Sequence, residues 1–317
     1  MSKALNFLRK LFSIREANIL FAFIALCAAV SIYAPDKFLN PFNIESVLRQ
    51  VAFFGLLSIG ETIVIITGGI DLSPGSVIAF IGVIVALFIK QGIPVPLAIL
   101  FALAISSLIG LWHGIFVTKL RVPPFIITLG TLSMARGGAS ALTKGWPVTG
   151  LPDSFNFLGR KGLPYLPIPF IILIVVFLVA HITMNYTTFG RRIYAIGGNI
   201  EAARLSGIDV DTGRILCYMI SAFLAGLSGI LIAANMGQGQ PGVGSAYELQ
   251  AIAGAVIGGT SLMGGEGTML GTLLGTFIIS VLYNALILLQ VSPYWHEIVV
   301  GSVVVVAVTI DVLRRVK

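Results

Sequence analysis

The stretch VAFFGLLSIGETIVIITGGIDLSPGSVIAFIGVIVALFIK, Val51–Lys90, decides the fold. It joins two apolar runs, at about 47–67 and 75–89, through the glycine-rich segment GGIDLSPG. A helix crosses a bilayer with about 20 apolar residues. Backbone that leaves helical geometry at that depth must find its hydrogen-bond partners inside the protein. The stretch therefore predicts two membrane helices joined by a broken segment.

Eight further apolar runs follow on either side of this stretch. They lie at about 17–34, 95–118, 123–143, 167–184, 214–235, 247–263, 267–290 and 294–313. The chain of 317 residues is 57% hydrophobic and 10% charged, with a mean hydropathy of +1.00, whereas a soluble domain is about 25% charged. This composition excludes a disordered protein, a coiled coil and an ordinary cytosolic enzyme. We predict an all-α polytopic membrane protein, one domain over 1–317, with about ten spans.

Basic residues set the expected orientation. The net charge is +7 and the pI about 9.6, which we interpret as the Lys and Arg bias of cytoplasmic loops and not as a nucleic-acid surface. If ten spans begin inside, 13 of the 20 basic residues fall on the inner side and six on the outer side. The inner set is Lys3, Arg9, Lys10, Arg15, Lys119, Arg121, Arg191, Arg192, Arg204, Arg214, Arg314, Arg315 and Lys317. We therefore predict that both termini are cytoplasmic.

Three segments outside the runs have distinct characters. Residues 1–16 are basic and amphipathic, which suits a helix lying on the cytoplasmic surface. The segment 145–167 is rich in Pro and Gly and is expected outside. The segment 185–213 is the one long polar loop expected inside. A soluble partner would therefore bind largely at 185–213.

Glycines and other small residues recur with two kinds of spacing. GGIDLSPG at 68–75 aligns with GGTSLMGG at 258–265, which suggests a weak parallel repeat. Elsewhere small residues stand four positions apart, which lets helix backbones approach closely in lipid. These ladders are Ser106-Gly110-Gly114, Gly254-Gly258 and Gly267-Gly271-Gly275. They predict tight helix packing.

Motifs for other functions are incomplete. No Lys lies in a GxxxxGK[ST] loop, so the chain has no P-loop for ATP. GQGQPG at 237–242 matches GxGxxG but follows a membrane run instead of a strand. GLSG at 226–229 and GGID at 68–71 are similar to motifs of intramembrane proteases, yet the required base or second acid has no matching context. Cys27 and Cys217 form neither a CxxC pair nor a metal-ligand spacing.

Ionisable residues inside spans are costly and usually functional. The candidates are Glu61, Arg136 and Glu248, of which Glu61 and Arg136 could pair across the bundle. Asp71 or Ser73 could cap the helix whose first turn holds Pro74, and Asp71 could instead contact the substrate. We hypothesise that the two glycine-broken segments line or gate a substrate path. Its residues would be Gly68, Gly69, Asp71, Ser73, Gly258, Gly259 and Ser261.

The inner segment 185–213 contains a helical turn with marked ends. Asn199 is expected as its N-cap, and Gly207 is expected to end it. An acidic residue near its start suits the helix dipole, and two adjacent alanines permit close approach of another surface. We predict that this turn and nearby arginines dock on a soluble partner. The docking residues would be Arg191, Arg192, Asn199, Glu201, Ala202, Ala203, Arg204 and Gly207.

Four stretches resemble the permease subunits of bacterial ABC importers for monosaccharides, the ribose/xylose/galactoside permease family. They are ETIVIITGGIDLSPGS at 61–76, PPFIITLGTLSMARG at 123–137, TTFGRRIYAIGGNIEAARLSGI at 187–208 and AIAGAVIGGTSLMGGEGTMLGTLLG at 251–275. Their combination is specific and spans most of the chain. Pro74 departs from the family pattern, in which Val is commoner, but a Pro at a helix start is easily accommodated. The order EAAxxxG also resembles the EAA loop of ABC importers.

This resemblance implies a function and a set of partners. Two permease subunits, identical or similar, would form the path across the bacterial inner membrane, and alternating access would import a monosaccharide, with ribose favoured. A separate cytoplasmic ATP-binding-cassette subunit would hold the ATP and magnesium, and its groove would receive the EAA helix. An extracytoplasmic binding protein would deliver the sugar. The chain would then hold no cofactor or metal, bind no nucleic acid and not be an enzyme.

Other functions stay open at this point. The alternative within the same machinery is import of xylose, a galactoside or a furanose-like signal molecule such as autoinducer-2. An ion-coupled secondary transporter would work without partners, and an intramembrane protease would cleave peptides. Uptake and proteolysis by the isolated chain separate these classes, because an ABC permease should do neither alone.

Overall fold

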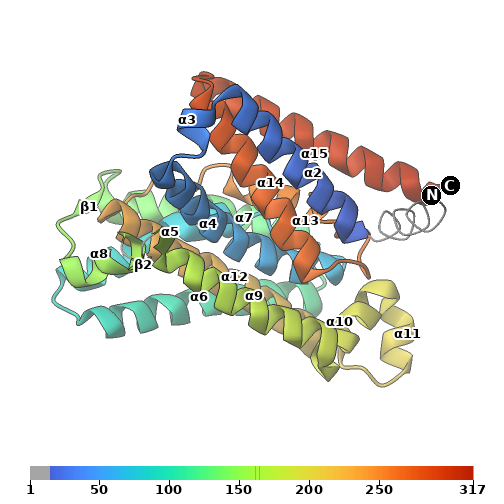
Figure 1. Cartoon of the computed structure of the whole chain (residues 1–317). Coiled ribbons are helices and arrows are strands. Elements are labelled where there is room, and N and C mark those ends of the chain that lie inside the picture. Colours follow the sequence, from blue (N-terminus) through green and yellow to red (C-terminus); the bar gives the residue numbers. More distant parts are fainter. Residues whose placement is uncertain (1–14, 161, 164, 317) are drawn as a thin grey trace, which may run out of the picture.

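The computed structural model of the chain describes residues 15–160, 162–163 and 165–316. Helices dominate it, and two short strand pairs, β1 with β4 and β2 with β3, are antiparallel (Figure 1). The elements in chain order are α2 (Arg15–Tyr33), α3 (Pro35–Phe38), α4 (Pro41–Ile66), α5 (Pro74–Lys90), α6 (Val95–Thr118), α7 (Pro124–Thr143), β1 (Val148–Thr149), α8 (Asp153–Arg160), β2 (Gly162–Leu163), β3 (Leu166–Pro167), α9 (Ile168–Tyr186), α10 (Thr188–Gly198), α11 (Ile200–Leu205), α12 (Val210–Met236), β4 (Gln238–Gly239), α13 (Tyr247–Ile257), α14 (Met269–Leu288) and α15 (Pro293–Val316).

Each of the ten apolar runs forms a helix, so the predicted all-α polytopic fold is confirmed. Among the described residues, α2, α4, α6, α7, α9, α12 and α14 are long and apolar enough to cross a membrane by themselves. α5 and α13 are apolar but shorter. α13 ends at Ile257, earlier than the run that predicted it, because Gly258 and Gly259 stop the helix. Each of these two shorter helices adjoins one of the glycine-rich segments.

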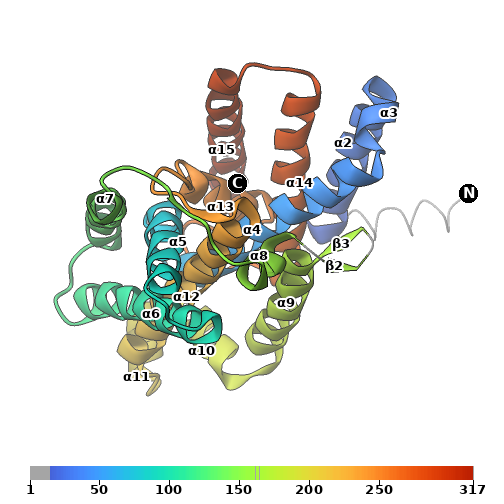
Figure 2. The same ribbon diagram turned by 90° about the vertical axis from the view of Figure 1, so that its left-hand side faces the viewer.

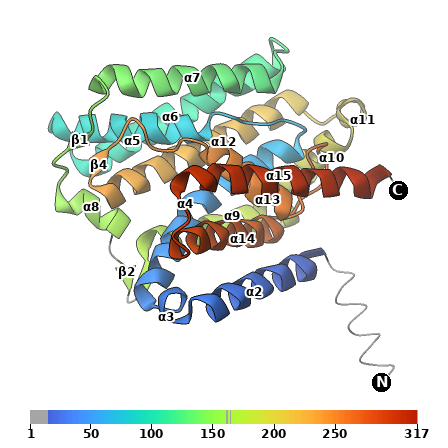
Figure 3. The ribbon, with the colours of Figure 1, turned by 90° about the horizontal axis from the view of Figure 1, so that it is seen from above.

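The bundle has two distinct ends. The start of α2, the end of α15, α10 and α11 lie at one end, and α3, α8 and the strands lie at the other (Figures 1 and 3). The predicted orientation places the first end in the cytoplasm. The amphipathic segment 1–16 falls almost wholly outside the described residues.

α4 and α12 form the centre of the bundle (Figure 2). In α4, 89% of the most apolar window is buried, against 6% in α2. The buried side chains of α4 and α12 meet in one apolar cluster, which also takes residues from α9 and α10, such as Leu173 and Ile193. Apolar side chains of α2, α6, α7 and α9 face outward, as expected of helices in contact with lipid.

The small-residue ladders pack helix against helix, as predicted. Gly110 of α6 lies against the backbone of Tyr218 and Met219 in α12. Gly258 lies against the Gly271 carbonyl, and Gly275 of α14 lies against the Gly254 carbonyl. A side chain at any of these positions would overlap the backbone of the facing helix, so the crossings depend on glycine.

The inner loop is shorter and more ordered than the sequence predicted. α9 continues to Tyr186 and α12 begins at Val210, and the residues between them form a helical hairpin of α10 and α11. α10 was expected as loop. Its Ile193 and Ile196 are fully buried in the apolar core, so tertiary packing stabilises a helix that contains three glycines.

Candidate functional site

Asp71 is the centre of a buried polar cluster between α4, α5 and α12. Its carboxylate accepts hydrogen bonds from the backbone N–H of Ser73 (2.9 Å), the Ser73 hydroxyl (2.7 Å) and the Ser221 hydroxyl (3.1 Å). Its own N–H donates to Oε1 of Glu61 at 3.1 Å. These side chains are buried. Asp71 thus organises the turn into α5, where Pro74 occupies the first helical position.

Several polar atoms next to Asp71 have no hydrogen-bond partner in the described part of the chain. They are Oε2 of Glu61, the Tyr218 hydroxyl and Nδ1 of His113. His113 and Tyr218 meet edge to face, with ring centroids 6.1 Å apart, and Nε2 of His113 lies 2.8 Å from the Thr131 hydroxyl. Buried polar groups are normally paired. This imbalance makes the cluster a strong candidate for a site under functional constraint.

Arg136 has partners other than Glu61, which the sequence offered as a possible one. Its guanidinium donates to the carbonyl oxygens of Pro241 (3.1 Å), Val243 (2.5 Å) and Gly75 (3.4 Å), and it lies near Glu248. Pro241 and Val243 belong to the irregular segment between β4 and α13, whose carbonyls have no helical partner. Arg136, on the candidate span α7, therefore provides hydrogen-bond donors to the irregular backbone of this segment.

The predicted path residues belong to two broken segments, 67–73 between α4 and α5 and 258–268 between α13 and α14. Both preceding helices end in a Schellman motif, with Gly68 (φ 78°) and Gly259 (φ 91°) in the left-handed conformation. The structure thus matches Gly68 to Gly259, one residue away from the alignment suggested by sequence. Gly69 lies against the Tyr218 hydroxyl, and Ser261 is a buried turn residue.

The hairpin of α10 and α11 bears the predicted docking residues. The Asn199 side chain accepts from the Ala202 N–H at 2.9 Å, which confirms the N-cap. Gly207 has φ 79° and ends α11 in a Schellman motif, as predicted. Arg191, Arg192, Glu201, Ala202 and Arg204 are exposed, whereas Ala203 is buried against the bundle.

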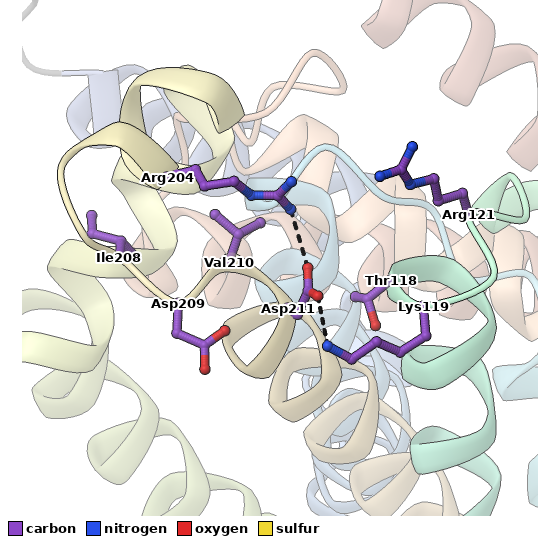
Figure 4. Close-up of a pocket in the computed structure, with 8 residues that line it drawn as sticks. All are labelled: Thr118, Lys119, Arg121, Arg204, Ile208, Asp209, Val210 and Asp211. Carbon is purple, nitrogen blue, oxygen red and sulfur yellow. Dashed lines mark hydrogen bonds and ion pairs between the residues drawn. The ribbon is translucent and has the colours of Figure 1, made fainter.

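Ion pairs clamp α11 to the membrane helices (Figure 4). Asp211 in the first turn of α12 binds Lys119 at the end of α6 (2.7 Å) and Arg204 of α11 (3.2 Å). The neighbouring Asp209 caps α12 through the Thr212 N–H, and the hydrogen bonds from Thr212 lower the pKa of Asp209. These contacts fix the position of α11 relative to α6 and α12. Because both basic partners are largely exposed, each pair contributes at most about 1 kcal/mol.

Two residues of this hairpin were missed by sequence reasoning. Leu205, at the end of α11, is 91% exposed. Tyr194 of α10 donates its hydroxyl to the Gly267 carbonyl at 2.7 Å, and burial raises the pKa of this phenol. The sequence signal for Leu205 was its position as an apolar residue within a polar segment. No local sequence pattern indicated that Tyr194 bonds to Gly267, because the two residues lie far apart in the chain.

The protease-like motif has a structural explanation. The hydroxyl of Ser228 in GLSG donates to the Phe53 carbonyl at 3.1 Å and is buried between α12 and α4. Nε2 of His296 lies 3.1 Å from the Val291 carbonyl. The hydrogen-bond partner of each side chain is a backbone carbonyl, so Ser228 and His296 do not form the serine–histidine pair that a protease requires. The motif therefore serves helix packing.

Known proteins resemble this chain over most of its length. The profile described as "Branched-chain amino acid transport system / permease component" matches residues 43–308. The ribose import permease of Bacillus subtilis is 42% identical, covering 90% of this chain and 89% of the relative, and that of Haemophilus influenzae is 41% identical, covering 93% of each. The xylose transport system permease of Escherichia coli is 32% identical, covering 92% and 91%. No solved structure matches the chain.

The profile begins within α4 and ends within α15, and it includes both broken segments and the hairpin. The relatives align over about nine-tenths of their own lengths, so the similarity is not confined to an isolated motif. The chain therefore belongs to this family of transport permeases.

Proposed function

We propose that the chain is the transmembrane subunit of an ABC importer in the bacterial inner membrane, and that it imports ribose. The graded similarity to relatives carries the choice of substrate: the ribose permeases are 41–42% identical, and the xylose permease is 32% identical over a similar share of the chain. The family description names amino acids. The sugar permeases support a sugar, because their similarity extends over nearly the whole chain. Xylose is the second candidate.

In this proposal the chain makes and breaks no covalent bond and binds no nucleotide. A separate cytoplasmic ATPase subunit holds ATP and magnesium, and a binding protein delivers the sugar on the other side. Positive charge supports the sidedness, because most of the Lys and Arg residues that the structure describes belong to elements at the end that bears α10 and α11.

The hairpin of α10 and α11 is the proposed docking site of the ATPase subunit. Its exposed residues, including Leu205, project from the end of the bundle, while Asp211 and the buried Ala203 hold α11 on the membrane helices. A large exposed leucine beside small residues suits insertion into a groove. The ion-pair clamp would transmit force from that groove to α6 and α12.

The face of α7 beside the segment 240–246 is the proposed contact with a second copy of the chain. Arg136 and Glu248 are only half-buried here, and Ser133 and Gly137 of α7 are exposed. Polar groups at membrane depth do not face lipid. This face would therefore border the substrate path between two copies. Cysteines at Gly137 in a background without Cys27 and Cys217 should cross-link, and cysteines at Leu178 on the opposite apolar side, in α9, should not.

Sugar uptake tests the proposed substrate. Cells that lack their own ribose permease should accumulate labelled ribose when they express this chain with its ATPase and binding protein. Excess unlabelled ribose should abolish the signal, and excess xylose or leucine should reduce it far less. Accumulation inhibited by leucine but not by ribose would contradict the proposal, and stronger inhibition by xylose would reassign the sugar.

A further inference from the structure

Three segments of backbone meet at the end of the bundle that bears the hairpin, with no side chain between them. They are the C-terminal part of α10 at Gly197, the end of α4 at Ile66–Gly68, and the second broken segment at Gly264–Gly265. We call this contact the glycine junction. It joins the hairpin to both broken segments at one point.

The contacts of the glycine junction are backbone to backbone. The Gly265 N–H donates to the Ile66 carbonyl at 2.9 Å, across 199 residues of sequence. A methyl group at Gly197 would overlap that same carbonyl oxygen and lie 2.5 Å from the Gly265 nitrogen. A methyl group at Gly264 would lie 3.0 Å from the Gly68 nitrogen and 3.1 Å from the Gly197 carbonyl. Each segment therefore touches the other two.

A second contact ties α10 to the same region. Tyr194 lies about one turn before Gly197 and donates its hydroxyl to the carbonyl of Gly267, just before α14. α10 thus contacts the second broken segment at two points, Gly197 and Tyr194. At Gly197 it also contacts the start of the first broken segment. Of the residues in this contact, Tyr194 alone contributes a side chain.

This arrangement is stiff. No flexible side chain lies between the contacting backbone atoms to absorb a displacement. Packed interiors also move between discrete arrangements instead of deforming continuously. Beyond the junction, the first broken segment leads to Asp71 and its buried cluster, and the second leads to α14. A displacement of α10 would therefore move both segments together.

We propose that the glycine junction is the link through which the hairpin moves the two broken segments as one unit, with Gly197 and Tyr194 as positioning residues. This inference rests on the proposed role of the hairpin as the ATPase docking site. It adds to that role the route from α10 into the membrane and the simultaneous movement of the two segments.

Two adjacent glycines provide a matched test. The methyl position of Gly197 is filled by backbone, and that of Gly198 points into open space. The full complex with ATPase and binding protein is reconstituted in liposomes, and ATPase binding, ATP hydrolysis and sugar uptake are measured. Gly197→Ala should retain ATPase binding but lose about 10-fold or more in sugar transported per ATP, a typical coupling effect. Gly198→Ala should stay within about twofold of the unmodified complex.

Tyr194→Phe provides a milder test that removes one hydroxyl. Loss of one hydrogen bond should reduce transport per ATP by about 3- to 10-fold, with ATPase binding unchanged. If Gly197→Ala does not assemble, this variant decides. Normal coupling in both Gly197→Ala and Tyr194→Phe, or equal loss in Gly198→Ala, would overturn the inference. A wild-type chain that binds no ATPase subunit would instead overturn the proposed function.

Discussion

Asp71 stands out in the sequence as an acidic residue between two apolar runs, and its hydrogen bonds give it a structural role. Its buried carboxylate accepts three hydrogen bonds, two from Ser73 and one from Ser221, and these bonds hold the turn into α5. Ser73 occupies the N-cap position of α5 without a side-chain capping bond, and the Asp71 carboxylate instead binds Ser73 in the turn before the helix. The sequence could indicate the bonds to Ser73, which are local. It could not indicate Ser221, 150 residues away.

Replacement of Asp71 should therefore affect stability. Asp71→Ala leaves three buried donors without an acceptor and should lower the free energy of unfolding by about 3 kcal/mol. The melting temperature of the purified protein should fall by roughly 5 °C or more. Asp71→Asn keeps one acceptor oxygen and should lose less. Melting can be followed by fluorescence-detected size exclusion. An Asp71→Ala protein with normal melting but no transport would instead assign Asp71 to the substrate path.

At the scale of elements, local signals predicted helix ends better than they predicted helices held by distant contacts. Asn199 and Gly207 bound α11 as expected, because capping depends on neighbouring residues. α10 was not predicted, because its stability depends on burial of Ile193 and Ile196 in the core. The sequence left open whether Glu61 and Arg136 pair, for the same reason: helix packing decides which side chains meet across a bundle, and it places Arg136 beside Val243.

Leu205 offers a clean test of the docking helix. Gly207→Pro or Ala203→Trp would disturb the hairpin itself, because Gly207 has a positive φ and Ala203 is buried. Leu205→Asp changes an exposed side chain and should weaken ATPase binding by about 30-fold, the effect of a hot-spot loss near 2 kcal/mol. Co-purification with the ATPase subunit measures it.

Leu39 provides the control for this substitution. It is 57% exposed at the end of α3, which lies at the opposite end of the bundle. Leu39→Asp should leave ATPase binding unchanged. Equal binding by the Leu205 variant and the unmodified chain would remove α11 from the interface.

At the scale of the whole molecule, the sequence predicted ten helices because each membrane helix has its own apolar run. The helix boundaries near Gly258 and the order of packing did not follow from those runs. The orientation rests on charge, and the structure adds that the start of α2 and the end of α15 lie at the same end of the bundle as the hairpin. Both termini and the hairpin should thus face the same compartment.

Labelling of single cysteines tests this orientation. In intact cells, a cysteine at Asp153 in α8 should react with an impermeant thiol reagent, and a cysteine at Asp209 should react only after the membrane is opened. Both positions are exposed, so accessibility within the protein is matched. The reverse pattern would place the hairpin outside and exclude a cytoplasmic partner there.

The energy source is the most direct test of the proposed transport mechanism. The chain is reconstituted in liposomes with its ATPase subunit, with the binding protein and labelled ribose on the side of α8 and ATP on the side of α11. We predict ribose accumulation that needs ATP, stops with a catalytically inactive ATPase subunit and is absent with the chain alone. Ribose accumulation by the isolated chain, driven by a proton or sodium gradient without ATP, would contradict it.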